Sequence, residues 1–91
     1  MEFDFSQVKV QAIDGTDIPA EGVYKPLANA IYRATQKLDL VDAALKINQG
    51  QSVFLVEDDV KEVRRIINDP AVGFFAFIRK ALNDFLDNKG V

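Results

Sequence analysis

The stretch DPAVGFFAFIRKALNDFL, from Asp69 to Leu86, decides the architecture that this sequence predicts. At about 100° per residue, its apolar side chains form one helical stripe. The members of the stripe are Phe74, Ile78, Ala81, Leu82 and Phe85. Phe75 and Leu86 lie on one flank of the stripe and Phe77 on the other. The apolar arc then covers about half of the helix surface, so we expect this helix to be covered on more than one side.

The flanks of this helix are the candidate interaction surface of the chain. One interpretation makes it the central helix of a small core, with both flanks buried. The other leaves one flank exposed, either Phe75 with Leu86 or Phe77, as a two-fold or partner interface. Exposed aromatic side chains mark contact surfaces. Both interpretations predict a structure rather than an activity.

The composition predicts a single folded domain spanning residues 1–91. Its hydrophobic fraction of 48% is sufficient to supply a core at this length. Cysteine and histidine are both absent, which removes disulfides, thiolate nucleophiles, the usual zinc ligands and the usual near-neutral acid/base group. We therefore expect no cofactor, no metal and no catalytic activity.

The charge and the first residues bear on partners and location. A net charge of −3 argues against broad electrostatic attachment to nucleic acid or to an anionic membrane. The opening sequence MEFDFSQVKV lacks a basic segment followed by an apolar one, and no apolar run approaches the ~20 residues of a membrane span. These features predict a cytoplasmic protein without a membrane partner.

The first half of the chain predicts a hairpin followed by two helices. VKVQAI, residues 8–13, alternates like a strand, and Asp14-Gly15 predicts a tight turn before a return strand that ends near Ile18. The first helix is expected from Lys25, because Pro26 suits a first helical turn, and its buried stripe is expected to reach Leu38. The second is expected from Leu40 to Gln49, with Asp39 as N-cap and Gly50 after its end.

The second half predicts one strand and two helices. QSVFLV, residues 51–56, is apolar on both faces and predicts a doubly covered strand. Three acids at 57–59 open a helix that Asn68 ends, and Asp69-Pro70 starts the last helix, which the sequence Asn88-Lys89-Gly90 ends. The predicted order is β-β-α-α-β-α-α.

We expect an α+β fold in which a three-stranded antiparallel sheet, the N-terminal hairpin plus one central strand, packs against about four helices. A mostly helical bundle with a β-hairpin is the alternative.

The charged residues offer two candidate sites. Glu57, Asp58 and Asp59 form the densest carboxylate cluster, but consecutive helical residues point about 100° apart, so helix-start electrostatics explains them better than catalysis. A carboxylate hydrolase would need a pocket where two acids converge. Basic residues on the last two helices, namely Lys61, Arg64, Arg65, Arg79 and Lys80, make a DNA-linked role the minority interpretation.

Half of the chain resembles small proteins that prophages and other mobile elements encode. The matching features are LANAIY from Leu27 to Tyr32, Gly50 after a helix, Val53 and Leu55 in a short strand, and the acidic helix start from Asp58 to Ile67. The resemblance implies an accessory role in a phage or mobile-element life cycle through binding other proteins. It carries no activity and no functional residues.

These observations favour a non-catalytic interaction or assembly protein. Its partner is expected to be another protein or a second copy of itself, and self-association is the favoured form. A small regulator that binds nucleic acid or a DNA-bound protein is the alternative. DNA binding through a basic patch would weaken steeply with salt, which separates the two.

Overall fold

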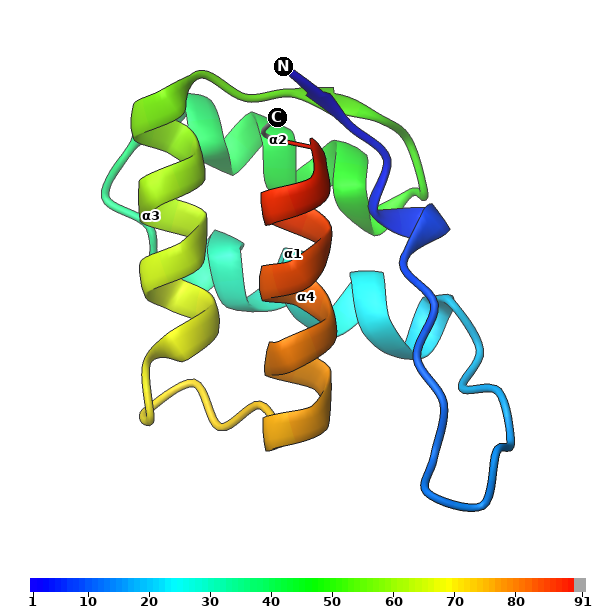
Figure 1. Ribbon diagram of the computed structural model, residues 1–91. Helices are drawn as coiled ribbons and strands as arrows, with labels where there is room; N and C mark the ends of the chain where they lie inside the picture. The colour runs from blue at the N-terminus through cyan, green and yellow to red at the C-terminus, as the bar shows by residue number, and fades with distance from the viewer. Residues whose placement is uncertain (90–91) are drawn as a thin grey trace.

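The computed structural model describes residues 1–89, which form a mostly helical structure with a small two-stranded sheet (Figure 1). The elements in order are β1 (Glu2–Phe3), the 3-10 helix η1 (Phe5–Gln7), α1 (Glu21–Ala34), α2 (Leu38–Asn48), β2 (Val53–Phe54), α3 (Glu57–Asn68) and α4 (Ala76–Lys89). In Figure 1, α3 and α4 run side by side in opposite directions in front of α1 and α2. The four predicted helices are present, but the last begins at Ala76 and not at Asp69-Pro70, because residues 69–75 form a turn and a connecting loop instead. The predicted end of that helix at Gly90 lies outside the described residues.

The predicted three-stranded sheet is wrong. The described residues contain one sheet, in which β1 pairs antiparallel with β2 and Phe3 lies opposite Val53. The predicted strand over 8–13 makes only an isolated bridge between Gln11 and Asp17. Val8 and Val10 are buried, so the core holds this segment through its side chains. The alternation of apolar and polar residues in this segment therefore indicated which side chains are buried, and not that the backbone pairs with a strand.

The turn inside this segment is confirmed. Gly15 has φ 86°, and its N–H donates to the C=O of Ala12 at 2.9 Å. The carboxylate of Asp14 accepts a hydrogen bond from the N–H of Thr16 at 2.9 Å. Only glycine adopts such a φ without strain, which is why the Asp-Gly pair was readable in the sequence. Residues 11–18, here called the 11–18 loop, project from the body of the molecule (Figure 1).

The strand expected at 51–56 is shorter than predicted and is not covered on both faces. Val53 and Leu55 are buried, whereas Phe54 is 70% exposed. The sheet therefore covers the core with one face only. Its partner β1 was missed, because two residues are too few to show a period.

Helix α1 begins at Glu21, four residues before the predicted start at Lys25. Pro26 is tolerated inside the helix, at the cost of one backbone hydrogen bond. Val23 and Leu27 are both fully buried and lie four residues apart, so their burial favours helix across the proline. The predicted continuation to Leu38 is also wrong, since Leu38 starts α2 and is 87% exposed.

Helix α2 ends at Asn48, and Gly50 follows the C-cap Gln49 as the predicted C′ residue. Gly50 has φ 74°, its N–H donates to Ile47 C=O at 2.9 Å, and Gln51 N–H donates to Lys46 C=O at 3.0 Å. These two bonds form a Schellman motif. The predicted N-cap is wrong, because Asp39 lies in the first turn and Lys37 occupies the cap position.

Helix α4 is covered on more than one side, as predicted. Leu82 and Leu86 are buried in the core, and α4 packs along α3. On another side the ring of Phe85 lies 5.4 Å from the ring of Phe5 and 6.3 Å from that of Phe3, measured between centroids. Residues 3 and 5 therefore close the core against the C-terminal helix. Within residues 1–89, none of the helices combines the length and apolar character that a membrane span requires.

Candidate interaction surface

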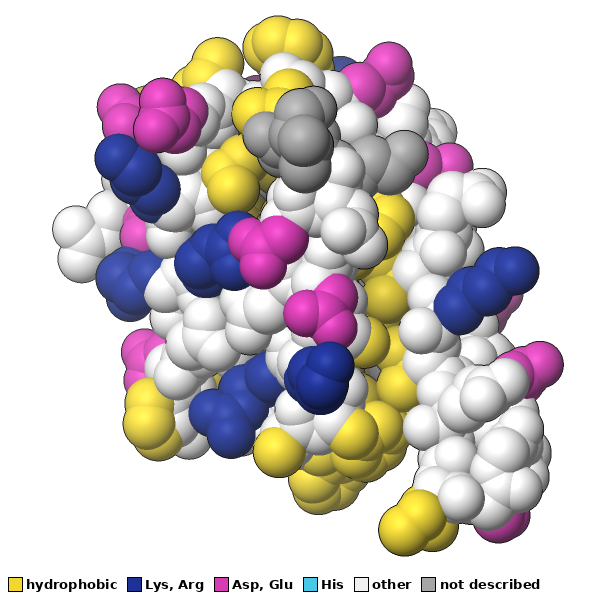
Figure 2. All heavy atoms as spheres, in the orientation of Figure 1, with side chains coloured by type: hydrophobic (Ala, Val, Ile, Leu, Met, Phe, Trp, Pro, Cys, Tyr) yellow, Lys and Arg dark blue, Asp and Glu magenta, His cyan; other side chains and the backbone are white. Residues whose placement is uncertain are grey.

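Phe75 and Phe77 form an exposed aromatic pair at the start of α4. Their rings are stacked, with centroids 6.1 Å apart and planes 6° apart, and they are 70% and 45% exposed. The C=O of Phe75 accepts hydrogen bonds from the N–H groups of Ile78 at 3.1 Å and Arg79 at 3.0 Å. These bonds attach the backbone of Phe75 to the first turn of α4, and the two rings, here called the aromatic patch, contact each other. Figure 2 shows apolar surface at this end of α4.

Leu86 does not belong to this surface, so its predicted exposure is wrong. It is 1% exposed and lies in the core with Leu82, one turn earlier. The prediction placed Phe75 and Leu86 on one flank because it assumed that the helix already included Phe75. Helix α4 begins only at Ala76. The side chain of Phe75 therefore does not follow the 100° rotation of the residues that come after it.

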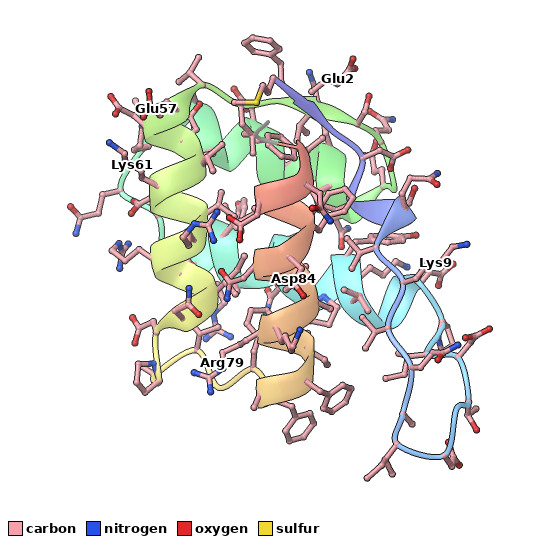
Figure 3. All side chains as sticks on the ribbon, in the orientation of Figure 1. Glu2, Lys9, Glu57, Lys61, Arg79 and Asp84 are labelled. Carbon is pink, nitrogen blue, oxygen red and sulfur yellow. The ribbon has the colours of Figure 1, made fainter. Side chains whose placement is uncertain are left out.

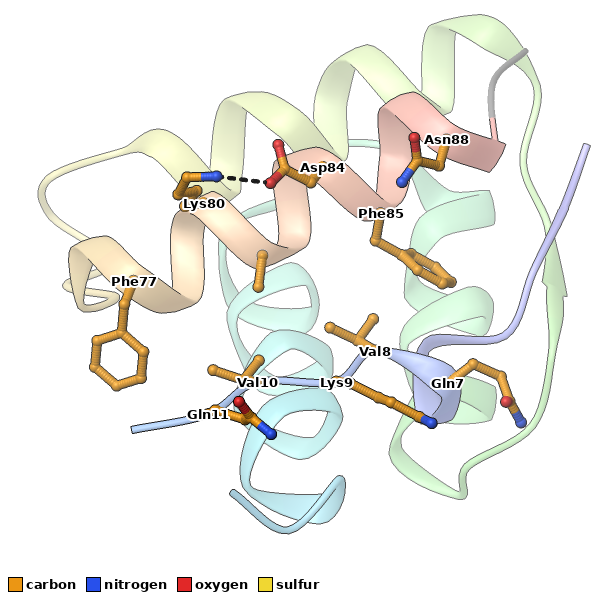
Figure 4. Close-up of a pocket in the computed structure, with 11 residues that line it drawn as sticks. Gln7, Val8, Lys9, Val10, Gln11, Phe77, Lys80, Asp84, Phe85 and Asn88 are labelled. Atoms are coloured by element: carbon orange, nitrogen blue, oxygen red, sulfur yellow. Dashed lines mark hydrogen bonds and ion pairs between the residues drawn. The ribbon is translucent and has the colours of Figure 1, made fainter. Parts of the chain in front are cut away.

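A groove runs along α4 from the aromatic patch (Figure 4). It has a volume of about 360 Å³ and lies between α4 and residues 7–11. Val8 and Val10 point toward α4 in Figure 4, and Phe77 lies at the end near the start of the helix. On the rim, Lys80 pairs with Asp84 at 3.0 Å. The groove is thus lined by apolar and polar side chains, and its one carboxylate is already paired.

A second hollow of about 550 Å³ lies between α1 and the α3–α4 connection. Its lining includes the charged residues Arg33 and Asp69 beside Ala30, Val72 and Phe74. With one carboxylate, this hollow does not bring together the two acids that a carboxylate hydrolase needs. No group of three or more metal-ligating side chains occurs within residues 1–89.

Lys61, Arg64 and Arg65 each pair with an acid. Lys61 lies 3.9 Å from Glu57, Arg64 2.7 Å from Asp87 and Arg65 2.7 Å from Glu62. The hydrogen bond from Arg65 holds the pKa of Glu62 below its ordinary value. Figure 2 shows basic and acidic side chains interleaved over α3 and α4. The three residues therefore do not form an open positive patch.

Arg64 belongs to a polar seam between α3 and α4 that the sequence analysis missed. It donates to Asn83 at 3.2 Å as well as to Asp87, and the amides of Asn68 and Asn83 bond each other in both directions at 3.2 and 2.9 Å. The available signal was spacing, because residues 64 and 68 on α3 and residues 83 and 87 on α4 are each four apart.

The acidic start of α3 contains a buried carboxylate that forms an ion pair with a partly exposed lysine. Asp59 is 4% exposed, and its carboxylate lies 2.7 Å from the ammonium of Lys37. Burial raises the pKa of Asp59, but the interaction with Lys37, followed by those with the side chain of Asp39 and the backbone of Val56, outweighs burial and leaves the pKa below its ordinary value. The same hydrogen bond raises the pKa of Lys37. Asp59 thus fastens the α1–α2 connection to α3, a role that the sequence analysis did not predict.

Glu62 fastens the same connection from the next turn of α3. The hydroxyl of Thr35 donates to its carboxylate at 3.4 Å. The three acids at 57–59 lie in the first turn of α3, as expected, but Glu57 pairs with Lys61 whereas Asp59 turns inward. These carboxylates therefore do not converge on one point.

Comparison of the chain with protein-family models, with curated proteins and with solved structures gives no match.

Proposed function

We propose that this protein is a non-catalytic interaction domain that associates with a second copy of itself through the aromatic patch. The observation that carries the proposal is the exposed, stacked pair of Phe75 and Phe77. Leaving two rings in water is unfavourable, and covering them removes apolar surface at ~25 cal/mol per Å². Because the two rings already stack on each other, less side-chain entropy is lost on binding than for two separate exposed rings.

The charge arrangement supports protein contact over the nucleic-acid alternative. A nucleic-acid surface needs cations free to displace counterions from phosphates. Lys61, Arg64 and Arg65 instead face carboxylates. The separation of the acids likewise supports a role without acid/base catalysis.

The resemblance of LANAIY and the acidic helix start to prophage-encoded proteins supports an accessory role in a mobile element. That role and the cytoplasmic location stay predictions. They are compatible with a small domain that acts through contacts with other proteins.

Sedimentation velocity over a range of concentrations tests the proposal. The wild type is expected to form a dimer as concentration rises, and Phe77→Asp is expected to remain monomeric while it keeps its helical circular dichroism. The control is Phe54→Asp, because Phe54 is an exposed phenylalanine, as Phe77 is, but lies on β2. A wild type that is monomeric at every concentration would end the self-association proposal. Leu86→Asp is unsuitable, since it would disrupt the core.

A further inference from the structure

The aromatic patch alone is too small to make a stable dimer. A fully buried phenylalanine covers about 150–250 Å², so two rings that are 70% and 45% exposed offer on the order of 200 Å². A specific interface buries about 800 Å² on each partner. If the chain pairs through this patch, a second feature at the same end of the molecule must contribute.

The 11–18 loop is such a feature. Its Ile13 is 108% exposed, as accessible as in an extended chain. In Figure 1 the loop and the start of α4 reach the same end of the molecule. Figure 4 agrees, since Gln11 and Phe77 lie at the same end of the groove. The loop therefore presents an apolar tip beside the aromatic patch but directed away from the body of its own chain.

The charges around the two features are complementary. The loop carries Asp14 and Asp17, whereas Arg79 and Lys80 follow Ile78 on α4. Lys80 pairs with Asp84 of its own helix at 3.0 Å, so Arg79 supplies the uncompensated positive charge. Hydrogen bonds from Thr16 hold the pKa of Asp14 below its ordinary value, so this carboxylate is charged at neutral pH. Arg79 makes no ion pair with any described side chain, and its position near the start of α4 is visible in Figure 3. An acidic loop with an apolar tip thus matches a basic helix start with an aromatic pair.

We propose that two copies of this chain dimerise about a two-fold axis, with the 11–18 loop of each copy seated on the aromatic patch and on Arg79 and Lys80 of the other. This inference rests on the proposed self-association and specifies its geometry. A two-fold axis makes the contact twice, because residue i meets residue j and j meets i. Both features must then lie at one end of the molecule, as they do.

Removing the apolar tip is the first test. Ile13→Ser is expected to raise the dimer Kd at least about tenfold. The matched control is Leu38→Ser, because Leu38 is another aliphatic residue with 87% exposure that lies at the start of α2. The control is expected to leave the Kd unchanged. Thermal unfolding of each variant checks that the fold is retained.

Exchanging the charges is the second test. Asp17→Lys and Arg79→Glu/Lys80→Glu are each expected to be monomeric when alone. An equimolar mixture is expected to recover a heterodimer, because one contact then pairs the substituted loop with the substituted helix and the other pairs two unsubstituted partners. Sedimentation velocity of the mixture measures the mass of the species that forms. A dimer mass indicates a closed two-fold pair, whereas larger species would indicate an open chain of molecules.

The outcomes distinguish this inference from the function on which it rests. An Ile13→Ser variant that dimerises like the wild type, or a mixture that stays monomeric, overturns the loop contact. If Phe77→Asp still abolishes dimers in that case, the aromatic patch retains its role in self-association. A wild type that is monomeric throughout overturns both proposals.

Discussion

Two substitutions on α4, Leu86→Ala and Phe77→Ala, separate the role of this helix in folding from its role in association. Leu86 is 1% exposed, and Phe77 is 45% exposed. Truncating Leu86 removes three buried carbon groups at ~0.8 kcal/mol each and leaves a cavity, for a loss of about 3 kcal/mol in the free energy of unfolding. Truncating Phe77 removes surface that is already half in water, so we expect about 1 kcal/mol or less.

The loss at Leu86 is large beside the whole stability of the domain. A chain of 91 residues has a free energy of unfolding of roughly 5–14 kcal/mol. At ~4–8 °C per kcal/mol for a domain of this size, Leu86→Ala lowers the Tm by roughly 12–24 °C. Phe77→Ala is expected to lower it by a few degrees at most and to weaken the dimer instead.

Urea unfolding followed by circular dichroism checks both values, at a protein concentration where all forms are monomeric. The slope of the transition should stay constant, so that the midpoints report stability alone. The reasoning is refuted if Leu86→Ala costs less than about 1 kcal/mol. It is also refuted if the two substitutions are equally destabilising, because burial would then not be what distinguishes the two positions.

Three further predictions follow from single contacts. Gly50→Ala forces a side chain into φ 74° and places its Cβ 3.4 Å from the hydroxyl oxygen of Tyr24, so we expect a loss of about 1–2 kcal/mol, whereas Gly22→Ala in α1 should not be destabilising in urea unfolding. Arg64→Ala breaks the bonds to Asn83 and Asp87; because the pair is partly exposed, the loss should be below about 1 kcal/mol and should shrink at high salt in the same assay. Lys37→Met removes the ammonium that lowers the pKa of Asp59, and its effect should depend on pH. A lowered pKa in the folded state stabilises the wild type above the unfolded value of about 3.9 and ceases to do so as the pH falls through the folded value. Without the ammonium, burial is opposed only by the contacts of Asp59 with Asp39 and Val56, so its pKa should lie above that in the wild type. The variant should therefore lose stability at pH 7 and regain part of it, relative to the wild type, on acidification. Urea midpoints that run parallel in the two proteins from about pH 7 to about pH 4 would contradict this.

The helices were largely readable from the sequence because their signals are local. The three acids at 57–59 and Asn68 predicted the start and end of α3, whose bounds are Glu57–Asn68. Gly50 predicted the end of α2 because only glycine fits its φ of 74°. Pro26 led to a predicted start of α1 at Lys25, which is too late. The burial of Val23 and Leu27 outweighs the low helix propensity of this one proline.

The sheet and half of the candidate surface were not readable, because they depend on contacts between distant residues. The alternating residues 8–13 gave no sign that the core would hold them without a ladder. Strand β1 pairs with residues about fifty positions away in the sequence, and local sequence patterns do not predict such a pairing. Phe75 and Phe77 were identified, but the exclusion of Leu86 required the start of α4 to be known to one residue. The Lys37–Asp59 pair joins two segments whose separate patterns indicate only solvated charge.

The packing of Phe85 on Phe3 and Phe5 has a consequence for biosynthesis. These rings are separated by eighty positions or more in the sequence, yet they meet in the folded chain. During translation, α1 and β2 can cover part of the segment around Phe3 and Phe5, but its side chains are fully sheltered only after α4 has left the ribosome. We expect nascent chains truncated before α4 to be protease-sensitive and to recruit chaperones, with full protection gained only once Phe85 emerges.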